Sequence, residues 1–142
     1  IISTGMATFK EISTIYKLFR KSKCDISMLH CISSYPNNEA DSYLSNITYL
    51  KKNFKCEIGL SDHTNDIKTS LYSSVLGARI IEKHFTLSNN YKCPDSSVSI
   101  TPEQFKRLRL EIDKISLIIN KPTFGVRNVE KNIKIFKRKK IL

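Results

Sequence analysis

The chain has 142 residues, enough for one domain with a hydrophobic core of its own. Hydrophobic residues make up 40% and charged residues 26% of it, as in a soluble globular protein. No apolar run reaches the roughly 18 residues of a membrane-spanning helix, and no basic segment followed by an apolar stretch marks a secretory signal. The composition therefore excludes a membrane-embedded protein.

The net charge of +11 raises the question of nucleic-acid binding. However, the lysines are spread over every predicted helix, mostly opposite its apolar stripe, and only residues 131–140 form a dense basic cluster. No aromatic platform or recognition helix accompanies that cluster. We therefore expect no direct binding of nucleic acid, and an AT-biased genome, which enriches Lys, Asn and Ile, explains the charge. A tail that binds an acidic partner is the weaker alternative.

The four cysteines are scattered, with no C-x-x-C pair among them. A zinc ribbon or a disulfide framework would need tighter, patterned spacing. We therefore expect reduced thiols in a cytoplasmic protein. The four positions are Cys24, Cys31, Cys56 and Cys93.

Short apolar strands alternate with amphipathic helices along the chain. The first helix is expected to begin at the capping box Thr8–Glu11, in which each end residue bonds the backbone N–H of the other. The fourth begins in the same way at Thr101–Gln104, with Pro102 as its first residue. Gly77 is placed to end the third. In chain order, we expect strands at 1–2, 26–31, 56–60 and 79–85, and helical apolar stripes over 12–19, 44–54, 67–75 and 105–115.

This alternation gives four strand–helix units of about 25 to 30 residues, the spacing of a (β/α)8 TIM barrel, which has roughly 250 residues in eight units. A small flavodoxin-like open sheet is the alternative, but it would gather its site at one switch point. Here polar residues follow every strand, which favours the barrel. The predicted fold class is therefore α/β, with residues 1–120 as the C-terminal half of a TIM barrel. The polar residues are Ser3; His30 and Ser33; Ser61, Asp62 and His63; and Glu82, His84 and Thr86.

The pattern lapses after about residue 120. Residues 121–125 form a predicted turn, and the basic stretch beyond it resembles a linker. We expect residues 121–142 to lead towards a further domain. Residues 1–3 read as the tail of a strand already in progress, so we also expect the chain to lack sequence at both ends.

Two of the three histidines, His63 and His84, follow the third and fourth predicted strands. Alternation along the fourth strand places Glu82, His84 and Thr86 on one face and Lys83 on the other. A lone histidine at a strand end is usually a buried, satisfied one, here paired with Glu82. A second imidazole on the neighbouring strand, only about 5 Å away, favours a shared divalent metal instead.

The loops after the strands carry further candidates. Residues 3–6, Ser-Thr-Gly-Met, present hydroxyls and backbone N–H groups that suit an anion, although such a turn before a helix is common. Tyr35 follows the second strand and is a lid aromatic or a ligand contact. Asp95 lies in the loop 88–99, which is long enough to form a functional lid, although an aspartate there is usually only solvated.

Together these segments resemble the N-acetylneuraminate synthase family, which includes legionaminate, pseudaminate and spore-coat polysaccharide synthases. The resemblance runs from residue 1 to about residue 138. Its most specific part is the pair Ser-Asp-His-Thr and Glu-Lys-His-Phe-Thr-Leu. The motifs that carry it, in order, are 3–6, 30–36, 59–64, 77–87 and 94–95.

The resemblance implies a transferase that condenses phosphoenolpyruvate with an N-acetylated amino sugar, N-acetylmannosamine or a 2,4-diacetamido sugar, to a nine-carbon 2-keto acid. A divalent metal, usually Mn²⁺ with Mg²⁺ and Co²⁺ as alternatives, would be held by His63 and His84 and act as a Lewis acid. Glu82 and Asp62 would orient the histidines, with Glu82 counted among the catalytic residues. Phosphoenolpyruvate would contact Ser3, Ser33 and Ser61, and the sugar would contact Tyr35 and Asp95.

The chain departs from the family pattern in a few places. The loop that usually reads Gly-Pro-Asp-His is Cys93-Pro-Asp-Ser96, Ser88 replaces an acidic residue, and Ser33 does not identify the sugar. The resemblance also places further metal and phosphoenolpyruvate ligands on four earlier barrel strands, and a sugar-binding arginine on a C-terminal antifreeze-like domain of a homodimer. We therefore expect these 142 residues alone to be inactive. The alternative is a non-catalytic remnant that serves as an interaction or dimerisation module.

Overall fold

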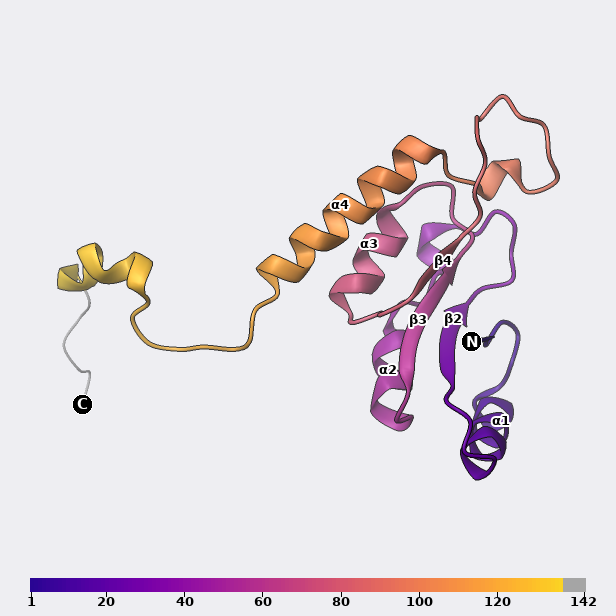
Figure 1. Cartoon of the computed structure of the whole chain (residues 1–142), viewed down its shortest axis with the longest axis horizontal. Helices are drawn as coiled ribbons and strands as arrows, with labels where there is room; N and C mark the ends of the chain where they lie inside the picture. Colours follow the sequence, from indigo (N-terminus) through magenta and orange to yellow (C-terminus); the bar gives the residue numbers. More distant parts are fainter. Residues whose placement is uncertain (137–142) are drawn as a thin grey trace.

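The computed structural model describes residues 1–136, in which short strands alternate with helices (Figure 1). No helix in this part of the chain combines the length and apolar character needed to cross a membrane. The strands are β1 (Ile2–Ser3), β2 (Ser27–Cys31), β3 (Glu57–Asp62) and β4 (Ile81–Lys83). The α-helices are α1 (Phe9–Lys21), α2 (Ser45–Asn53), α3 (Lys68–Val75) and α4 (Pro102–Ile118), and the 3-10 helices are η1 (Glu39–Asp41), η2 (Ser96–Val98) and η3 (Asn128–Phe136).

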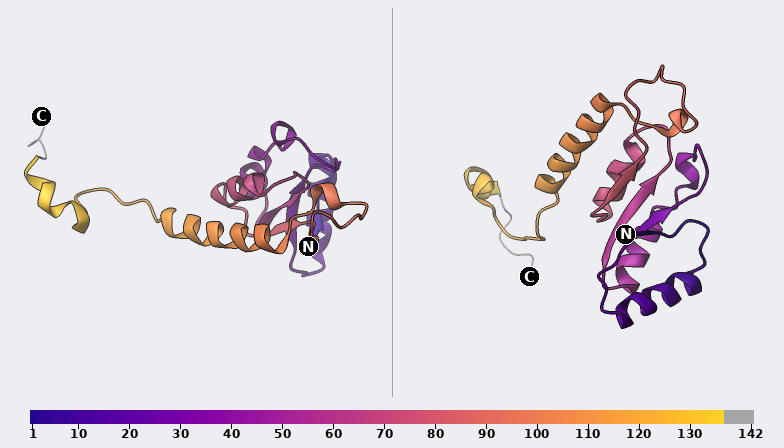
Figure 2. Two further views of the ribbon diagram at one scale, coloured as in Figure 1. Left: turned by 90° about the horizontal axis from the view of Figure 1, so that it is seen from above. Right: turned by 45° about the vertical axis from the view of Figure 1, so that its right-hand side comes forward.

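The four strands form one parallel sheet in the order β1-β2-β3-β4. Strand order therefore follows chain order without reversal, as in a barrel, whereas a flavodoxin-like sheet reverses at a switch point. The predicted α/β fold of TIM-barrel type thus agrees with the topology of residues 1–136. Two further views show the same succession of strands and helices, with η3 standing apart from the sheet (Figure 2).

The helices cover one face of the sheet. Met28 of β2 and Ile58 of β3 pair in register and join a buried cluster with Ile47 and Leu50 of α2. Ile81 of β4 packs in a second cluster between α3 and α4. Side chains at alternate positions must point away from these helices. The remaining strand residues therefore line the opposite face, which corresponds to the interior of a barrel.

Both predicted capping boxes are present, at the starts of α1 and α4. Gly77 ends α3 as predicted: its φ of 91° is left-handed, and its N–H donates to the carbonyl of Ser74. The fourth strand is shorter than predicted, because residues 84–86 leave β3 and pair with Ile100 instead. The N–H of Ile100 donates to the carbonyl of His84, and the N–H of Thr86 donates to the carbonyl of Ile100. Part of the predicted linker forms η3, whose side chains are exposed. The basic cluster 131–140 extends beyond the described residues.

Removing the cap of α4 should weaken the fold measurably. Thr101 Oγ1 accepts from the N–H of Gln104, and the side chain of Gln104 accepts in return from the N–H of Thr101. We expect Thr101→Ala to lower the free energy of unfolding by about 1 kcal/mol. Urea titration measures the difference. Thr123→Ala, which removes an exposed hydroxyl outside the α-helices, is the control and should leave the value unchanged.

Candidate functional site

A polar row crosses the open face of the sheet at the carboxyl ends of three strands. Cys31 of β2 pairs in register with Ser61 of β3, and Ser61 pairs with Glu82 of β4. The Ser61 hydroxyl donates to Glu82 Oε1 at 2.7 Å. Polar side chains on a barrel's inner face are costly to bury unless they are bonded to something. This row therefore forms the floor of a candidate site.

The two predicted histidines come together directly above this row. His63 follows β3 and His84 follows β4, and their ring centroids are 5.3 Å apart. Tyr35 joins them: its ring stacks on His63 at 4.0 Å and meets His84 edge-on at 5.6 Å. The chain therefore brings three side chains from three different loops into one aromatic cluster.

The contacts at Nδ1 leave Nε2 of each imidazole available: His63 Nδ1 is hydrogen-bonded, and His84 Nδ1 faces a carboxylate. His63 Nδ1 lies 2.9 Å from the carbonyl of Ile32, which can only accept, so Nδ1 carries the proton and Nε2 the lone pair. His84 Nδ1 lies 3.7 Å from Asp95 Oδ2, which favours the same tautomer. Imidazole nitrogens oriented in this way are typical metal ligands. The pair therefore suits a divalent metal as two of its ligands, although residues 1–136 contain no group of three or more His, Cys, Asp or Glu side chains able to hold an ion.

The predicted orienting roles of Glu82 and Asp62 are wrong in this structure. Glu82 accepts from Ser61 and not from either histidine, so the reading of His84 as a histidine paired with Glu82 fails as well. Asp62 faces the helices, where it contacts Lys83. The reason is alternation: Asp62 precedes His63 in the chain and must point to the opposite side of the sheet. The carbonyl of Ile32 and the carboxylate of Asp95 take the expected places beside the rings.

The remaining predicted contacts lie around the edge of this cluster. Ser3 is on the same face as Ser61 but one row lower, where it pairs in register with Leu29. Ser33 is exposed, and its Oγ lies 2.3 Å from the position of a Cβ added to Gly5, so the loops after β1 and β2 are in contact. The structure thus brings Tyr35 and Asp95 to the histidines. It places Ser3 at the end of β1, the edge strand of the described sheet, and Ser33 beside the loop that follows β1.

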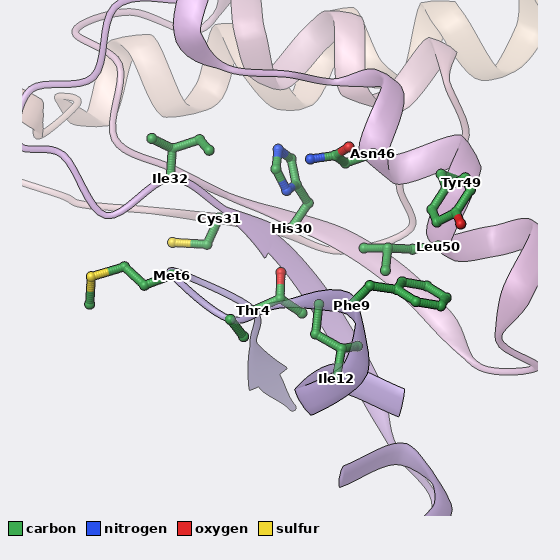
Figure 3. Close-up of a pocket in the computed structure, with 11 residues that line it drawn as sticks. Thr4, Met6, Phe9, Ile12, His30, Cys31, Ile32, Asn46, Tyr49 and Leu50 are labelled. Carbon is green, nitrogen blue, oxygen red and sulfur yellow. The ribbon is translucent and has the colours of Figure 1, made fainter. Parts of the chain in front are cut away.

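The third histidine belongs elsewhere. His30 points to the helix side of β2, where its Nε2 donates to the carbonyl of Ser42 at 2.7 Å. Burial lowers its pKa, so that His30 is a neutral, satisfied core residue. It lines a pocket of about 380 Å³ between the loop after β1 and α2, together with Thr4 and Asn46 (Figure 3). This pocket is separate from the two imidazoles.

Sequence reasoning missed the polar network behind the site. Asp62 and Lys83 pair in register on the helix side of the sheet, and Ser70 of α3 donates to the same carboxylate. The signal was present, because alternation already placed Lys83 opposite His84. Applying the same rule to β3 would have placed Asp62 beside it.

Comparison with known proteins gives consistent matches. The model of the NeuB family matches residues 1–123. An N,N'-diacetyllegionaminic acid synthase of Campylobacter jejuni is 40% identical over 81% of this chain and 35% of its own length. An N-acetylneuraminate-9-phosphate synthase of Drosophila melanogaster is 38% identical over 82% of this chain and 32% of its own.

A solved structure extends the comparison to three dimensions. The N-acetylneuraminic acid (sialic acid) synthetase of Leptospira borgpetersenii, crystallised with citrate, superposes with a TM-score of 0.88 and is 35% identical. The match covers 95% of this chain and 48% of that one. The chain thus spans about a third of the curated relatives and about half of the solved structure. This likeness confirms the α/β fold of TIM-barrel type.

Proposed function

The chain belongs to the NeuB family, and we propose that it supplies the C-terminal half of the catalytic barrel of a nonulosonate synthase. Relatives named as legionaminic, pseudaminic and N-acetylneuraminate-9-phosphate synthases support this class of reaction. The single observation that carries the proposal is the imidazole pair of His63 and His84. The two ring centroids are 5.3 Å apart, at the carboxyl ends of adjacent parallel strands, where barrel enzymes have their active sites.

The proposed reaction joins phosphoenolpyruvate to an N-acetylated amino sugar. A carbon–carbon bond forms between the methylene carbon of phosphoenolpyruvate and the aldehyde carbon of the sugar. Water adds to the phosphoenolpyruvate carbon that bears the phosphate, and the bond from that carbon to the phosphate oxygen breaks. One phosphate leaves, and a nine-carbon 2-keto acid remains. N-acetylmannosamine and a 2,4-diacetamido sugar are the two substrate candidates.

Residues on the inner face of the sheet would bind the metal and transfer the proton in this reaction. His63 and His84 would hold a divalent metal through Nε2, with Mn²⁺ the first choice and Mg²⁺ and Co²⁺ as alternatives. Such an ion supplies Lewis acidity towards the aldehyde oxygen of the sugar. Glu82 is an exposed carboxylate beside the imidazoles, fixed by the Ser61 hydroxyl, and is suited to take a proton from the attacking water.

The substrate contacts follow from the same arrangement. We assign the anionic groups of phosphoenolpyruvate to the hydroxyls of Ser3, Ser33 and Ser61. The amino sugar would lie over Tyr35, whose ring is half exposed above His63, with Asp95 accepting from a sugar hydroxyl. All four cysteines are free, which is consistent with the cytoplasmic location that we include in the proposal. We also propose a homodimer for the complete protein.

A non-catalytic interaction module is the second candidate. It is favoured by the apolar side chains exposed towards the end of the described chain, which include Leu117, Phe124 and Val129. A surface of this kind marks a contact with another protein segment. The imidazole pair has no place in that account, because an interaction module does not need two histidine nitrogens free at a strand end.

Phosphate release separates the two candidates. The full-length gene product is incubated with Mn²⁺, phosphoenolpyruvate and each candidate sugar, and inorganic phosphate is measured against a reaction without sugar. We expect release that depends on both the sugar and the metal. If no sugar raises phosphate above the sugar-free rate while the protein still forms a stable dimer, the interaction module is the better account.

A further inference from the structure

A buried ion pair lies directly behind the two histidines, on the helix side of the sheet. Asp62 immediately precedes His63, and Lys83 immediately precedes His84. The two residues are partners in the parallel register of β3 and β4, and Lys83 Nζ lies 3.3 Å from Asp62 Oδ2. Each side chain is only 1% exposed. The pair therefore joins the two strand ends that carry the imidazoles.

Every polar atom of this pair is bonded. Asp62 Oδ2 also accepts from the hydroxyl of Ser70 in α3 at 2.6 Å. Asp62 Oδ1 accepts from the N–H and the hydroxyl of Thr64 at 2.9 and 2.8 Å. Lys83 Nζ donates in addition to the carbonyl of Thr64. The network thus ties together the end of β3, the end of β4, the loop between β3 and α3, and α3 itself.

Stability alone does not account for such a pair. Removing two charges from water costs several kcal/mol for each ion, and a well-packed apolar pair in the same place is often as stable or more so. Burial indeed lowers the pKa of Lys83, although the Asp62 carboxylate opposes that shift. What a directional, bonded pair supplies better than apolar contacts is a fixed alignment of the two strands.

The register between β3 and β4 needs such a constraint because β4 is short. It spans only Ile81–Lys83 and has three register pairs with β3. A slip of one residue would turn every side chain to the other face of the sheet, which would move His84 away from His63 and leave Asp62 buried without its lysine. The cost of that unpaired charge opposes the slip.

We propose that the buried Asp62–Lys83 pair is a register lock that positions His84 against His63 from the opposite face of the sheet. The two residues are positioning residues, since their side chains lie on the helix side of the sheet, opposite the imidazoles. Ser70 supports the lock from α3. This inference rests on the proposed function only in taking the imidazole pair as a metal site.

The test measures affinity for Co²⁺ alone, by its visible absorption, on the full-length gene product. In the double variant D62L/K83M both charges are replaced by apolar side chains, so that no buried charge is left unpaired. We expect this variant to fold, to unfold at a lower temperature because the buried donors of Thr64 and Ser70 lose their acceptor, and to bind Co²⁺ about 10- to 100-fold more weakly. The control R109M/D113L removes the exposed pair of α4, which has an N–O distance of 2.7 Å, and should keep the wild-type affinity.

A milder pair of variants covers the case in which the double variant does not fold. Ser70→Ala removes one bond to Asp62 and should weaken Co²⁺ binding several-fold. Ser73→Ala removes an equally buried hydroxyl of the same helix that donates only to the carbonyl of Ser70, and it should not change the affinity.

The outcomes distinguish failure of the register lock from failure of the proposed metal site. Wild-type affinity in D62L/K83M, or equal affinities in the two serine variants, overturns the register lock and leaves the proposed function standing. Failure of the wild-type protein to bind Co²⁺ removes the metal site itself, and with it this inference.

Discussion

Replacing His63 or His84 by alanine in the full-length protein should lower the rate of phosphate release at least about 100-fold, because the loss of a metal ligand withdraws several kcal/mol of transition-state stabilisation. The affinity for Mn²⁺ should fall in parallel. Both effects follow from Nε2 of each ring, which remains available while Nδ1 of His63 bonds the carbonyl of Ile32 and Nδ1 of His84 faces Asp95. Steady-state kinetics and Mn²⁺ titration by electron paramagnetic resonance measure the two quantities.

The third histidine provides the matched control. His30 is also buried at a strand end, but it points to the helix layer and bonds the carbonyl of Ser42. His30→Gln should cost some stability and leave Mn²⁺ stoichiometry and affinity unchanged. If the alanine variants of His63 and His84 bind Mn²⁺ as the wild type does, the two imidazoles are not ligands and the assignment fails.

Gly59→Ala should destabilise the fold by about 3 kcal/mol, as expected for severe overpacking of a rigid site. An added Cβ would lie 2.3 Å from the carbonyl oxygen of Ile80 and 2.6 Å from Leu29 Cδ2. That oxygen accepts the N–H of Leu60 and cannot move without disturbing the β3–β4 pairing. Because His84 follows β4, the shift should also weaken metal binding. Urea titration and Co²⁺ affinity measure both consequences.

Gly5→Ala is the comparison, since its Cβ would make an equally close contact of a different kind. The nearest atom, again at 2.3 Å, is the hydroxyl of Ser33, which can rotate away. We expect a cost below about 1 kcal/mol, because a staggered rotamer remains available. Equal losses in the two variants would show that the close approach of Ile80 to Gly59 is not what limits the position.

Much of the fold was predictable because the signals were local. The capping residues Thr8 and Thr101 and the left-handed Gly77 act within one helical turn, and all three behave as predicted. The early end of β4 was not predictable in this way. It depends on Ile100, which approaches from beyond the following loop to take the backbone bonds of residues 84–86.

The candidate site likewise has features that the sequence predicts and features that it does not. The convergence of His63 and His84 could be predicted, since neighbouring parallel strands bring their ends together. The groups that face Nδ1 of each ring could not, because the carbonyl of Ile32 and the carboxylate of Asp95 reach the rings through the shapes of two loops. The sequence pointed instead to the nearest side-chain carboxylates, Asp62 one residue before His63 and Glu82 two residues before His84. Alternation excludes Asp62, and the Ser61 hydroxyl engages Glu82.

The identity of the product tests the central claim most directly. Mass spectrometry of a reaction of the full-length protein with phosphoenolpyruvate, the amino sugar and Mn²⁺ should show one new compound. The account predicts a 2-keto acid with the mass of phosphoenolpyruvate plus sugar plus water minus phosphoric acid, formed in an amount equal to the phosphate released. Phosphate accompanied by pyruvate and unchanged sugar would contradict it, because the protein would then hydrolyse phosphoenolpyruvate without forming a carbon–carbon bond.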